Sequence, residues 1–310
     1  MALAMFASVL LLLAGAQVPI ISVPLQKPPA RIERPIAPIE TAGPAFDAAC
    51  KGSDDWNKPA PPVRIFGNSY FVGTCGISAI LITSPQGHIL IDSGTEQGAD
   101  LVARNIGQLG FRLRDVRYLL HSHEHFDHVG GMARLQRLTG AQVVASAPAA
   151  RVLRMGVPAA DDPQAGSLSP MPPVTVDRIV QDGEMLRVGD NVLIAVATPG
   201  HTAGALSWRW GSCDGGKCRQ IVYADSLTPA SRDGYRFSDH PILVQAFRTS
   251  FAKIAALDCD ILITPHPSAS RMPDRFAGRA PLEDRNACRD YAEARTKQLD
   301  ERLAKEAAAR

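Results

Sequence analysis

His123-Glu124-His125-Phe126-Asp127-His128 is the most informative stretch of this chain, because it packs three imidazoles and two carboxylates into six consecutive positions. Neutral imidazole nitrogens suit zinc, and a carboxylate adds a charged oxygen ligand. Side chains that alternate along a short loop can reach two neighbouring ions at once. The stretch therefore predicts a binuclear zinc site.

The residues around this stretch place it between a strand and a helix. The run from Val116 to Leu120 predicts a strand, and we expect Gly130 and Gly131 to let the backbone turn tightly before a helix through Leu138. Folds of the α/β class put ligands at such positions. His121 belongs to the same cluster, but it ends the expected strand, so we expect it not to bind metal.

Strand-like and helix-like segments alternate along the chain, which predicts helices layered on sheets. The expected strands cover residues 63–66, 69–72, 77–83, 88–92, 116–120, 175–180, 185–188, 192–198, 205–210 and 219–223, and another begins at residue 260. The expected later helices cover 97–109, 241–257 and 284–309, the last capped by Asp284. His201 and His266 each follow an expected strand, so we expect both to join the metal site.

Composition sets the broad class of the protein. With 310 residues, of which 45% are hydrophobic and 21% charged, the chain can bury one large core. Its net charge is +2, and basic residues are interspersed with acidic ones. A nucleic-acid enzyme is expected to carry a clustered basic surface. This lowers the nuclease option without excluding it, and we expect no nucleic-acid partner.

The N-terminus predicts export. Residues 1–16 are an apolar run that ends in a small-residue site, as in a secretory signal peptide, and the run is too short to span a bilayer comfortably. No Lys or Arg precedes it, so an uncleaved anchor or a different start site stays open. Residues 17–44 are rich in proline and predict a disordered tether. We expect a catalytic domain over 45–310, located in the periplasm without stable membrane association.

Six cysteines are an even number, as expected for disulfides in an exported protein. Cys213 and Cys218 bracket the turn Asp214-Gly215-Gly216-Lys217 and can close a hairpin. The other expected pairs, Cys50 with Cys75 and Cys259 with Cys288, would constrain the two ends of the chain. In an alternative interpretation, some of these cysteines bind zinc, although no Cys-x-x-Cys spacing occurs.

Five motifs together resemble the metallo-β-lactamase superfamily over residues 45 to about 290. Within it, the chain is similar to the third subclass (B3) of class B β-lactamases; the first subclass has a cysteine ligand where this chain has Ser226. The resemblance implies an αβ/βα four-layer sandwich of two similar halves with the metal site at the sheet edges. The motifs are Ile89-Leu90-Ile91-Asp92-Ser93-Gly94, the His123–His128 stretch, Pro199-Gly200-His201-Thr202, Tyr223-Ala224-Asp225-Ser226-Leu227-Thr228 and Thr264-Pro265-His266-Pro267.

The resemblance also implies a ligand set and a mechanism. His123, His125 and His201 would hold the first zinc, and Asp127, His128 and His266 the second. A zinc-bound hydroxide, formed because zinc lowers the pKa of its water to about 7, would attack the lactam carbonyl. Asp127 would also handle a proton. No Ser-x-x-Lys or Gly-x-Ser-x-Gly motif is present, so no covalent nucleophile is expected.

Further residues receive roles from the same resemblance. Asp92 and Asp225 would orient the zinc ligands without binding zinc themselves. Asp92 can also be read as a turn-capping residue. Ser226 and Thr228 would bind the substrate carboxylate, and Gln164 would reach over the cleft. We expect a monomer with two Zn²⁺ ions that hydrolyses penicillins, cephalosporins and carbapenems, and thereby confers antibiotic resistance.

Two other functions compete with this interpretation. In the glyoxalase II branch of the superfamily, an aspartate that matches Asp225 bridges both zinc ions, and the substrate is a thioester. A zinc-binding protein without catalysis is the third hypothesis, which a decayed ligand position would favour. All six ligand positions are filled here.

Overall fold

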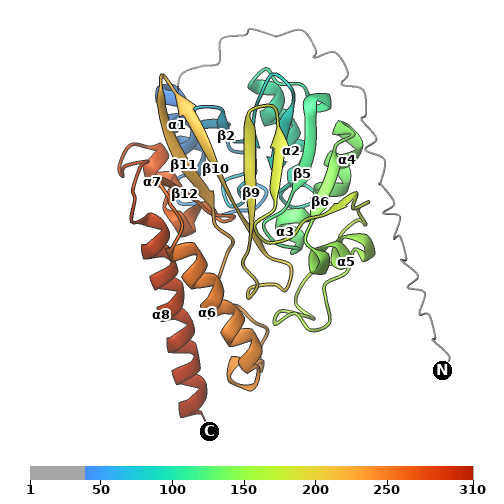
Figure 1. Ribbon diagram of the computed structural model, residues 1–310, viewed down its shortest axis with the longest axis vertical. Coiled ribbons are helices and arrows are strands. Elements are labelled where there is room, and N and C mark those ends of the chain that lie inside the picture. The colour runs from blue at the N-terminus through green and yellow to red at the C-terminus, as the bar shows by residue number, and fades with distance from the viewer. Residues whose placement is uncertain (1–38, 310) are drawn as a thin grey trace, which may run out of the picture.

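The computed structural model describes residues 39–309, whose strands form two sheets (Figure 1). The first sheet begins as an antiparallel meander and continues with parallel pairs from β4 onward. Its order is β1 (Val63–Phe66), β2 (Ser69–Phe71), β3 (Ile80–Ile82), β4 (His88–Ile91), β5 (Val116–Leu120), β6 (Gln142–Ala145) and β7 (Arg178–Ile179). The second sheet has the order β12 (Ile261–Ile263), β11 (Lys217–Tyr223), β10 (Leu206–Asp214), β9 (Asn191–Ala197) and β8 (Met185–Val188).

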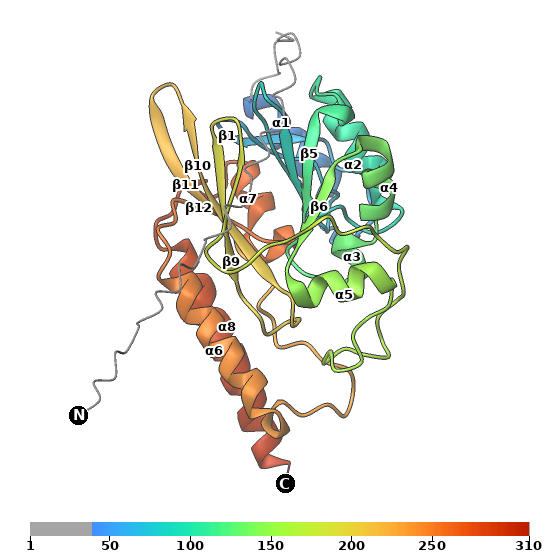
Figure 2. The ribbon, with the colours of Figure 1, turned by 45° about the vertical axis from the view of Figure 1, so that its right-hand side comes forward.

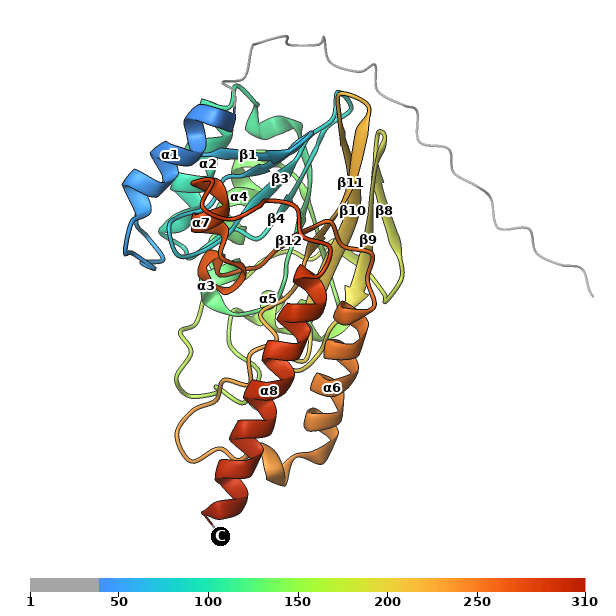
Figure 3. The same cartoon turned by 90° about the vertical axis from the view of Figure 1, so that its left-hand side faces the viewer.

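Helices cover the outer faces of both sheets. The helices α2 (Gly98–Gln108), α4 (Met132–Thr139) and α5 (Ala147–Met155) lie on the first sheet (Figure 2). The pair α6 (Pro241–Ala255) and α8 (Ala287–Ala308) lies on the second (Figure 3). The expected four-layer αβ/βα sandwich is thus confirmed. The remaining elements are α1 (Ile39–Cys50), α3 (Phe126–Val129), α7 (Met272–Phe276) and the 3₁₀ turns Leu113–Asp115, Phe237–Asp239 and Pro267–Ser270.

The largest buried cluster lies between the sheets and draws on both of them. Ile80 and Ile89 of the first sheet belong to it together with Trp208 and Tyr223 of the second, and all four are fully buried. Strands covered on both faces read as continuous apolar runs, as β12 does and as β4 does after its first residue, His88. Polar side chains can therefore approach this core only where strands end, and the metal motifs follow strand ends.

The folded part begins earlier than residue 45. Helix α1 starts at Ile39, so the last residues of the expected tether are helical, and Pro44 lies inside the helix. The physical reason is burial: the fully buried Phe46 packs its ring against Phe71 and Phe276, with centroids 5.3 and 5.2 Å apart. The expected signal, residues 1–16, and the tether up to residue 38 lie outside the described residues.

Two local expectations need correction. Gly130 and Gly131 do not form a special turn, because both have ordinary right-handed helical backbone angles. They are glycines because the chain packs closely there: a Cβ on Gly130 would lie 2.3 Å from the Phe126 carbonyl oxygen. At α8 the N-terminal cap residue is Asn286 rather than Asp284. The Asp284 carboxylate instead accepts a hydrogen bond from the backbone amide of Asn286.

The structure joins the six cysteines in three pairs: Cys50–Cys75, Cys213–Cys218 and Cys259–Cys288. Cys213 and Cys218 face each other across the β10–β11 hairpin. The other two pairs tie α1 to the segment after β2, and α8 to the segment before β12. Among residues 39–309, no helix has the length and apolar character needed to cross a bilayer.

Candidate metal centre

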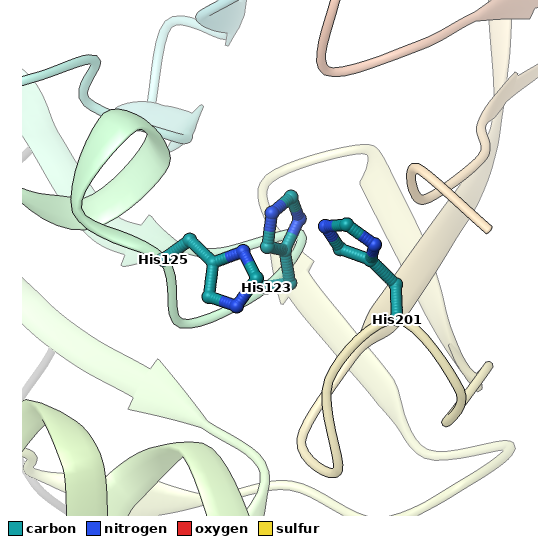
Figure 4. A group of neighbouring side chains, drawn as sticks. All are labelled: His123, His125 and His201. Atoms are coloured by element: carbon teal, nitrogen blue, oxygen red, sulfur yellow. The ribbon is translucent and has the colours of Figure 1, made fainter. Parts of the chain in front are cut away.

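The candidate centre forms where strands of both halves end. His123 and His125 lie on the loop after β5, and His201 lies on the loop after β9 (Figure 4). His266 follows β12, while Asp127 and His128 lie in α3. In Figure 4 the rings of His123, His125 and His201 approach one another from two separate ribbons, and the centroids of His123 and His201 are 4.7 Å apart. The candidate ligands, of which His123 and His266 are 143 positions apart in the sequence, therefore converge on one place.

One group consists of His123, His125 and His201, which each offer a ligand atom within 4.8 Å of the others. Each ring has one nitrogen bound to an oxygen acceptor behind it. His123 Nδ1 lies 2.8 Å from Asp225 Oδ1, His125 Nε2 lies 3.0 Å from Asp162 Oδ2, and His201 Nδ1 lies 2.8 Å from the Thr228 carbonyl oxygen. Such contacts fix the ring orientation and leave the other nitrogen for a metal.

One of these remaining nitrogens lacks a hydrogen-bond partner among the described residues. This atom, His123 Nε2, is buried. A buried polar atom without a partner costs free energy unless something else binds it. A divalent cation shared with His125 and His201 would satisfy this atom, so the donor set fits zinc.

A second group lies beside the first. Asp127 Oδ2 is 3.0 Å from His128 Nε2 and 3.5 Å from His266 Nε2, and the two imidazole nitrogens are 3.3 Å apart. His123, Asp127 and His128 offer ligand atoms within 4.8 Å of one another, so His123 lies at the boundary of the two groups. The Gly76 carbonyl oxygen approaches the outer nitrogen of His266 at 3.3 Å.

The protonation states suit a metal site. Burial and the neighbouring histidines hold the pKa of His123 well below its usual value, and burial lowers the pKa of His201 to about 3 and that of His266 to about 4. These rings are therefore neutral at pH 7, as ligands must be. His128 differs: burial opposes its charge, but Asp127 and Asp92 outweigh that effect and raise its pKa to about 10. A cation bound by Asp127 and His128 must displace the extra proton of His128.

Asp92 holds the start of the ligand loop. It follows β4, which runs parallel to β5, and its left-handed backbone (φ 62°) turns the carboxylate toward that loop. Its oxygens accept hydrogen bonds from the Ser122 amide at 2.6 Å, the Ser122 hydroxyl at 2.7 Å and the Tyr223 hydroxyl at 2.6 Å. Asp92 Oδ2 also lies 3.5 Å from His128 Nδ1.

Several side chains near the candidate ligands could not be assigned a role from the sequence. Asp162 is one, because the irregular loop that carries it has no periodicity that would single it out. Glu124 is another; it lies inside the quoted motif but received no role, and its side chain is buried. His121 belongs to neither ligand group; its Nε2 accepts a hydrogen bond from the Ser146 amide at 3.2 Å.

The three expected substrate-binding residues lie beside the ligands. The Ser226 hydroxyl is buried and has no partner in the part of the chain that the structure describes. The Thr228 hydroxyl donates to the Ser226 carbonyl oxygen at 3.0 Å. The backbone amide of Gln164 donates to Asp162 Oδ1 at 2.7 Å, and the Asp162 carboxylate in turn contacts His125.

Comparison with known proteins gives consistent results. Residues 72–215 match the model of a family described as the metallo-beta-lactamase superfamily. The chain is 52% identical to a solved structure of the MIM-2 metallo-beta-lactamase, which aligns over 86% of this chain and 98% of that chain with a TM-score of 0.82. The structure of MEM-A1, a subclass B3 metallo-beta-lactamase from a soil metagenome library, is 48% identical, over 83% of this chain and all (100%) of that chain, with a TM-score of 0.80.

Curated relatives align over a shorter region. A hydroxyacylglutathione hydrolase of Maricaulis maris is 31% identical over 110 residues, which make up 36% of this chain and 34% of that protein. The chain thus spans about a third of the length of the first curated relatives that it matches.

Proposed function

Because the chain belongs to the metallo-beta-lactamase superfamily, has its fold and is similar over most of its length to subclass B3 structures, we propose that it is a zinc-dependent β-lactamase. Its substrates would be penicillins, cephalosporins and carbapenems, and its activity would confer resistance to them. The observation that carries this proposal is the convergence of His123, His125 and His201 with the Asp127, His128 and His266 group.

We assign one zinc ion to each group. His123, His125 and His201 would hold the first, and Asp127, His128 and His266 the second. Two bound zinc ions would polarise a carbonyl group and activate a water molecule at neutral pH. The protein's own contribution is to keep His123, His201 and His266 neutral, to orient the rings through the groups that contact their other nitrogens, and to receive a proton at the Asp127 carboxylate.

Substrate binding would fall to the residues beside the ligands. The Ser226 hydroxyl, which has no hydrogen-bond partner among residues 39–309, would donate to the carboxylate of a β-lactam. Thr228 is positioned by its contact with Ser226, and its carbonyl oxygen also orients His201. We assign Gln164 to the rim of the cleft, on the loop that carries Asp162.

A thioester hydrolase is the second candidate, favoured by the matches to hydroxyacylglutathione hydrolases. In that function Asp225 would bridge two metal ions. Here Asp225 is fully buried and contacts His123 Nδ1, the ring nitrogen that faces away from the ligand group. This contact supports a role behind His123 rather than between two ions.

Direct comparison of two substrates tests the proposal. The purified protein is expected to hydrolyse nitrocefin, to lose this activity after treatment with a strong chelator, and to regain it with added zinc. A preference for S-lactoylglutathione would reverse the assignment toward thioester hydrolysis. Nitrocefin hydrolysis that persists undiminished after chelation would contradict the zinc centre.

We further propose that the chain is exported to the periplasm and that the three cysteine pairs are oxidised there, as is usual for disulfides in that compartment. The mature protein would be a monomeric catalytic domain without stable membrane association. Mass spectrometry of the periplasmic fraction would give the cleavage site and the disulfides; a mature N-terminus within residues 1–10 would contradict cleavage near residue 16.

A further inference from the structure

Glu124 separates the two first-zinc candidates His123 and His125 in sequence, but its side chain points elsewhere. Alternate side chains of an extended segment lie on opposite sides. The backbone at His125 is extended, and the carboxylate of Glu124 is buried against the loop that carries His201. Glu124 Oε2 accepts a hydrogen bond from the Thr202 hydroxyl at 2.7 Å, and Oε1 accepts one from the Gly204 amide at 2.8 Å.

These contacts continue a series of hydrogen bonds between the two halves of the molecule. Trp208 Nε1 donates to the His121 carbonyl oxygen at 2.9 Å, and the Leu206 amide donates to the Ser122 carbonyl oxygen at 2.7 Å. Residues 121–124 thus run antiparallel to 202–208. Beyond Ser122 the backbone contacts stop and the carboxylate of Glu124 takes their place, next to the ligand positions on both loops.

The receiving loop is built for a close approach. A Cβ on Gly204 would lie 2.5 Å from the Ala149 amide nitrogen and 2.8 Å from Glu124 Oε1, so only glycine fits there. On the other side, the Ser146 hydroxyl donates to the Gly204 carbonyl oxygen at 2.7 Å. Gly204 is therefore fixed between α5 and Glu124, three residues after His201.

We propose that Glu124 is a positioning residue that fixes His201, from the second half, relative to His123 and His125, from the first. This inference rests on the proposed zinc centre and refines it. The second group has no contact with Glu124 among residues 39–309. Loss of the carboxylate should therefore weaken the first metal position selectively.

Cobalt(II) titration of the metal-free protein tests this selectivity, because the absorption of bound cobalt reports each coordination site without any substrate. The parent is expected to bind two equivalents. In Glu124→Ala and Thr202→Val, one equivalent should bind about 10–100-fold more weakly, while the other stays at its parent affinity. Glu124→Gln retains one oxygen acceptor and the side-chain volume, so its affinity should lie closer to the parent than to Glu124→Ala.

Glu306→Gln is the matched control, because Glu306 is also a buried carboxylate that accepts two backbone hydrogen bonds, but it lies at α8. It should lower thermal stability and leave both cobalt affinities unchanged. Parent-like cobalt binding in both Glu124→Ala and Thr202→Val would overturn the inference, as would equal loss of both equivalents. If the parent binds cobalt but does not hydrolyse nitrocefin, the proposed function fails while this test stands; if the parent binds no cobalt, the metal centre and this inference both fail.

Discussion

At the scale of single residues, the candidate centre is defined by the groups that contact the outer nitrogen of each imidazole, on the side away from the ligand group. Asp225, Asp162 and the Thr228 carbonyl oxygen hold the outer nitrogens of the first group, and the Gly76 carbonyl oxygen approaches that of His266. Partners of this kind raise the basicity of the ligand and reduce its freedom. Metal affinity should therefore depend on residues that touch no metal.

Asp162 offers a direct test of this dependence. In Asp162→Ala the His125 ring loses the acceptor at its Nε2, so affinity at the first zinc position should fall about 10–100-fold. Competition with a chromophoric chelator measures this affinity. Asp161→Ala, an exposed aspartate of the same loop, is the control and should bind like the parent. Equal affinities in the two variants would show that the contact at 3.0 Å does not orient His125.

Asp127 tests the second position. Asp127→Asn removes the negative charge that lies between His128 and His266, so one zinc per chain should be lost at moderate metal concentration and turnover should fall. Metal analysis after dialysis and nitrocefin kinetics measure both. Asp100→Asn, an exposed aspartate of α2, should change neither. Wild-type turnover with normal zinc content in Asp127→Asn would contradict the ligand assignment.

At the scale of elements, a polar side chain at the end of a helix can hold neighbouring segments together. The C-terminal end of α8 illustrates this: Glu306 accepts hydrogen bonds from the amides of Phe237 and Ser238 and from Arg302. These bonds close the turn before α6 onto α8. The two helices of the second half are thereby held at the end that lies away from the sheet (Figure 3).

Glu306 makes the stability of this element depend on pH. Burial opposes its charge, but the hydrogen bonds from Ser238, Phe237 and Arg302 outweigh that effect and lower its pKa from 4.5 to about 2. A depressed carboxyl pKa stabilises the fold above pH 4.5, and this contribution is lost as the pH falls toward 2.

Denaturant unfolding of Glu306→Gln measures this contribution. The free energy of unfolding should fall by about 1.5–3 kcal/mol at pH 7, as for other hydrogen bonds to charged groups, and the difference from the parent should shrink below pH 4.5. Glu301→Gln, on the exposed face of the same helix, should stay within about 0.5 kcal/mol of the parent. A deficit for Glu306→Gln that is the same at pH 7 and pH 3 would rule out the charge as its source.

At the scale of the whole molecule, the candidate centre joins the two halves of the sandwich. The first half supplies His123, His125, Asp127 and His128, and the second supplies His201 and His266. Unfolding separates these ligands, so a metal ion binds the folded chain far better than the unfolded one. Bound metal should therefore stabilise the entire fold and not only the site.

Chelation tests this coupling. Removal of metal should lower the melting temperature, and restored zinc at 1,000 times its dissociation constant should return about 4 kcal/mol of stability. Differential scanning calorimetry with and without a chelator measures the change, and magnesium, which disfavours imidazole ligands, is the control ion. An unchanged melting temperature would mean that no metal ties the two halves together.

The sequence by itself predicted the layered fold, nearly every strand and the identity of the candidate ligands. These depend on local properties: apolar runs bounded by turns, and histidines that directly follow them. Helix α1 begins at Ile39 and buries Phe46, which local composition, dominated by proline, did not indicate.

Only the tertiary structure decided which side chains contact and orient the ligands. Asp162 meets His125 across 37 positions and Glu124 meets Gly204 across 80. Neither contact follows from periodicity or spacing, because each joins irregular loops whose path is set by the packing of the two sheets. The ligand types are thus encoded locally, whereas their orientation arises from the assembly of the two halves.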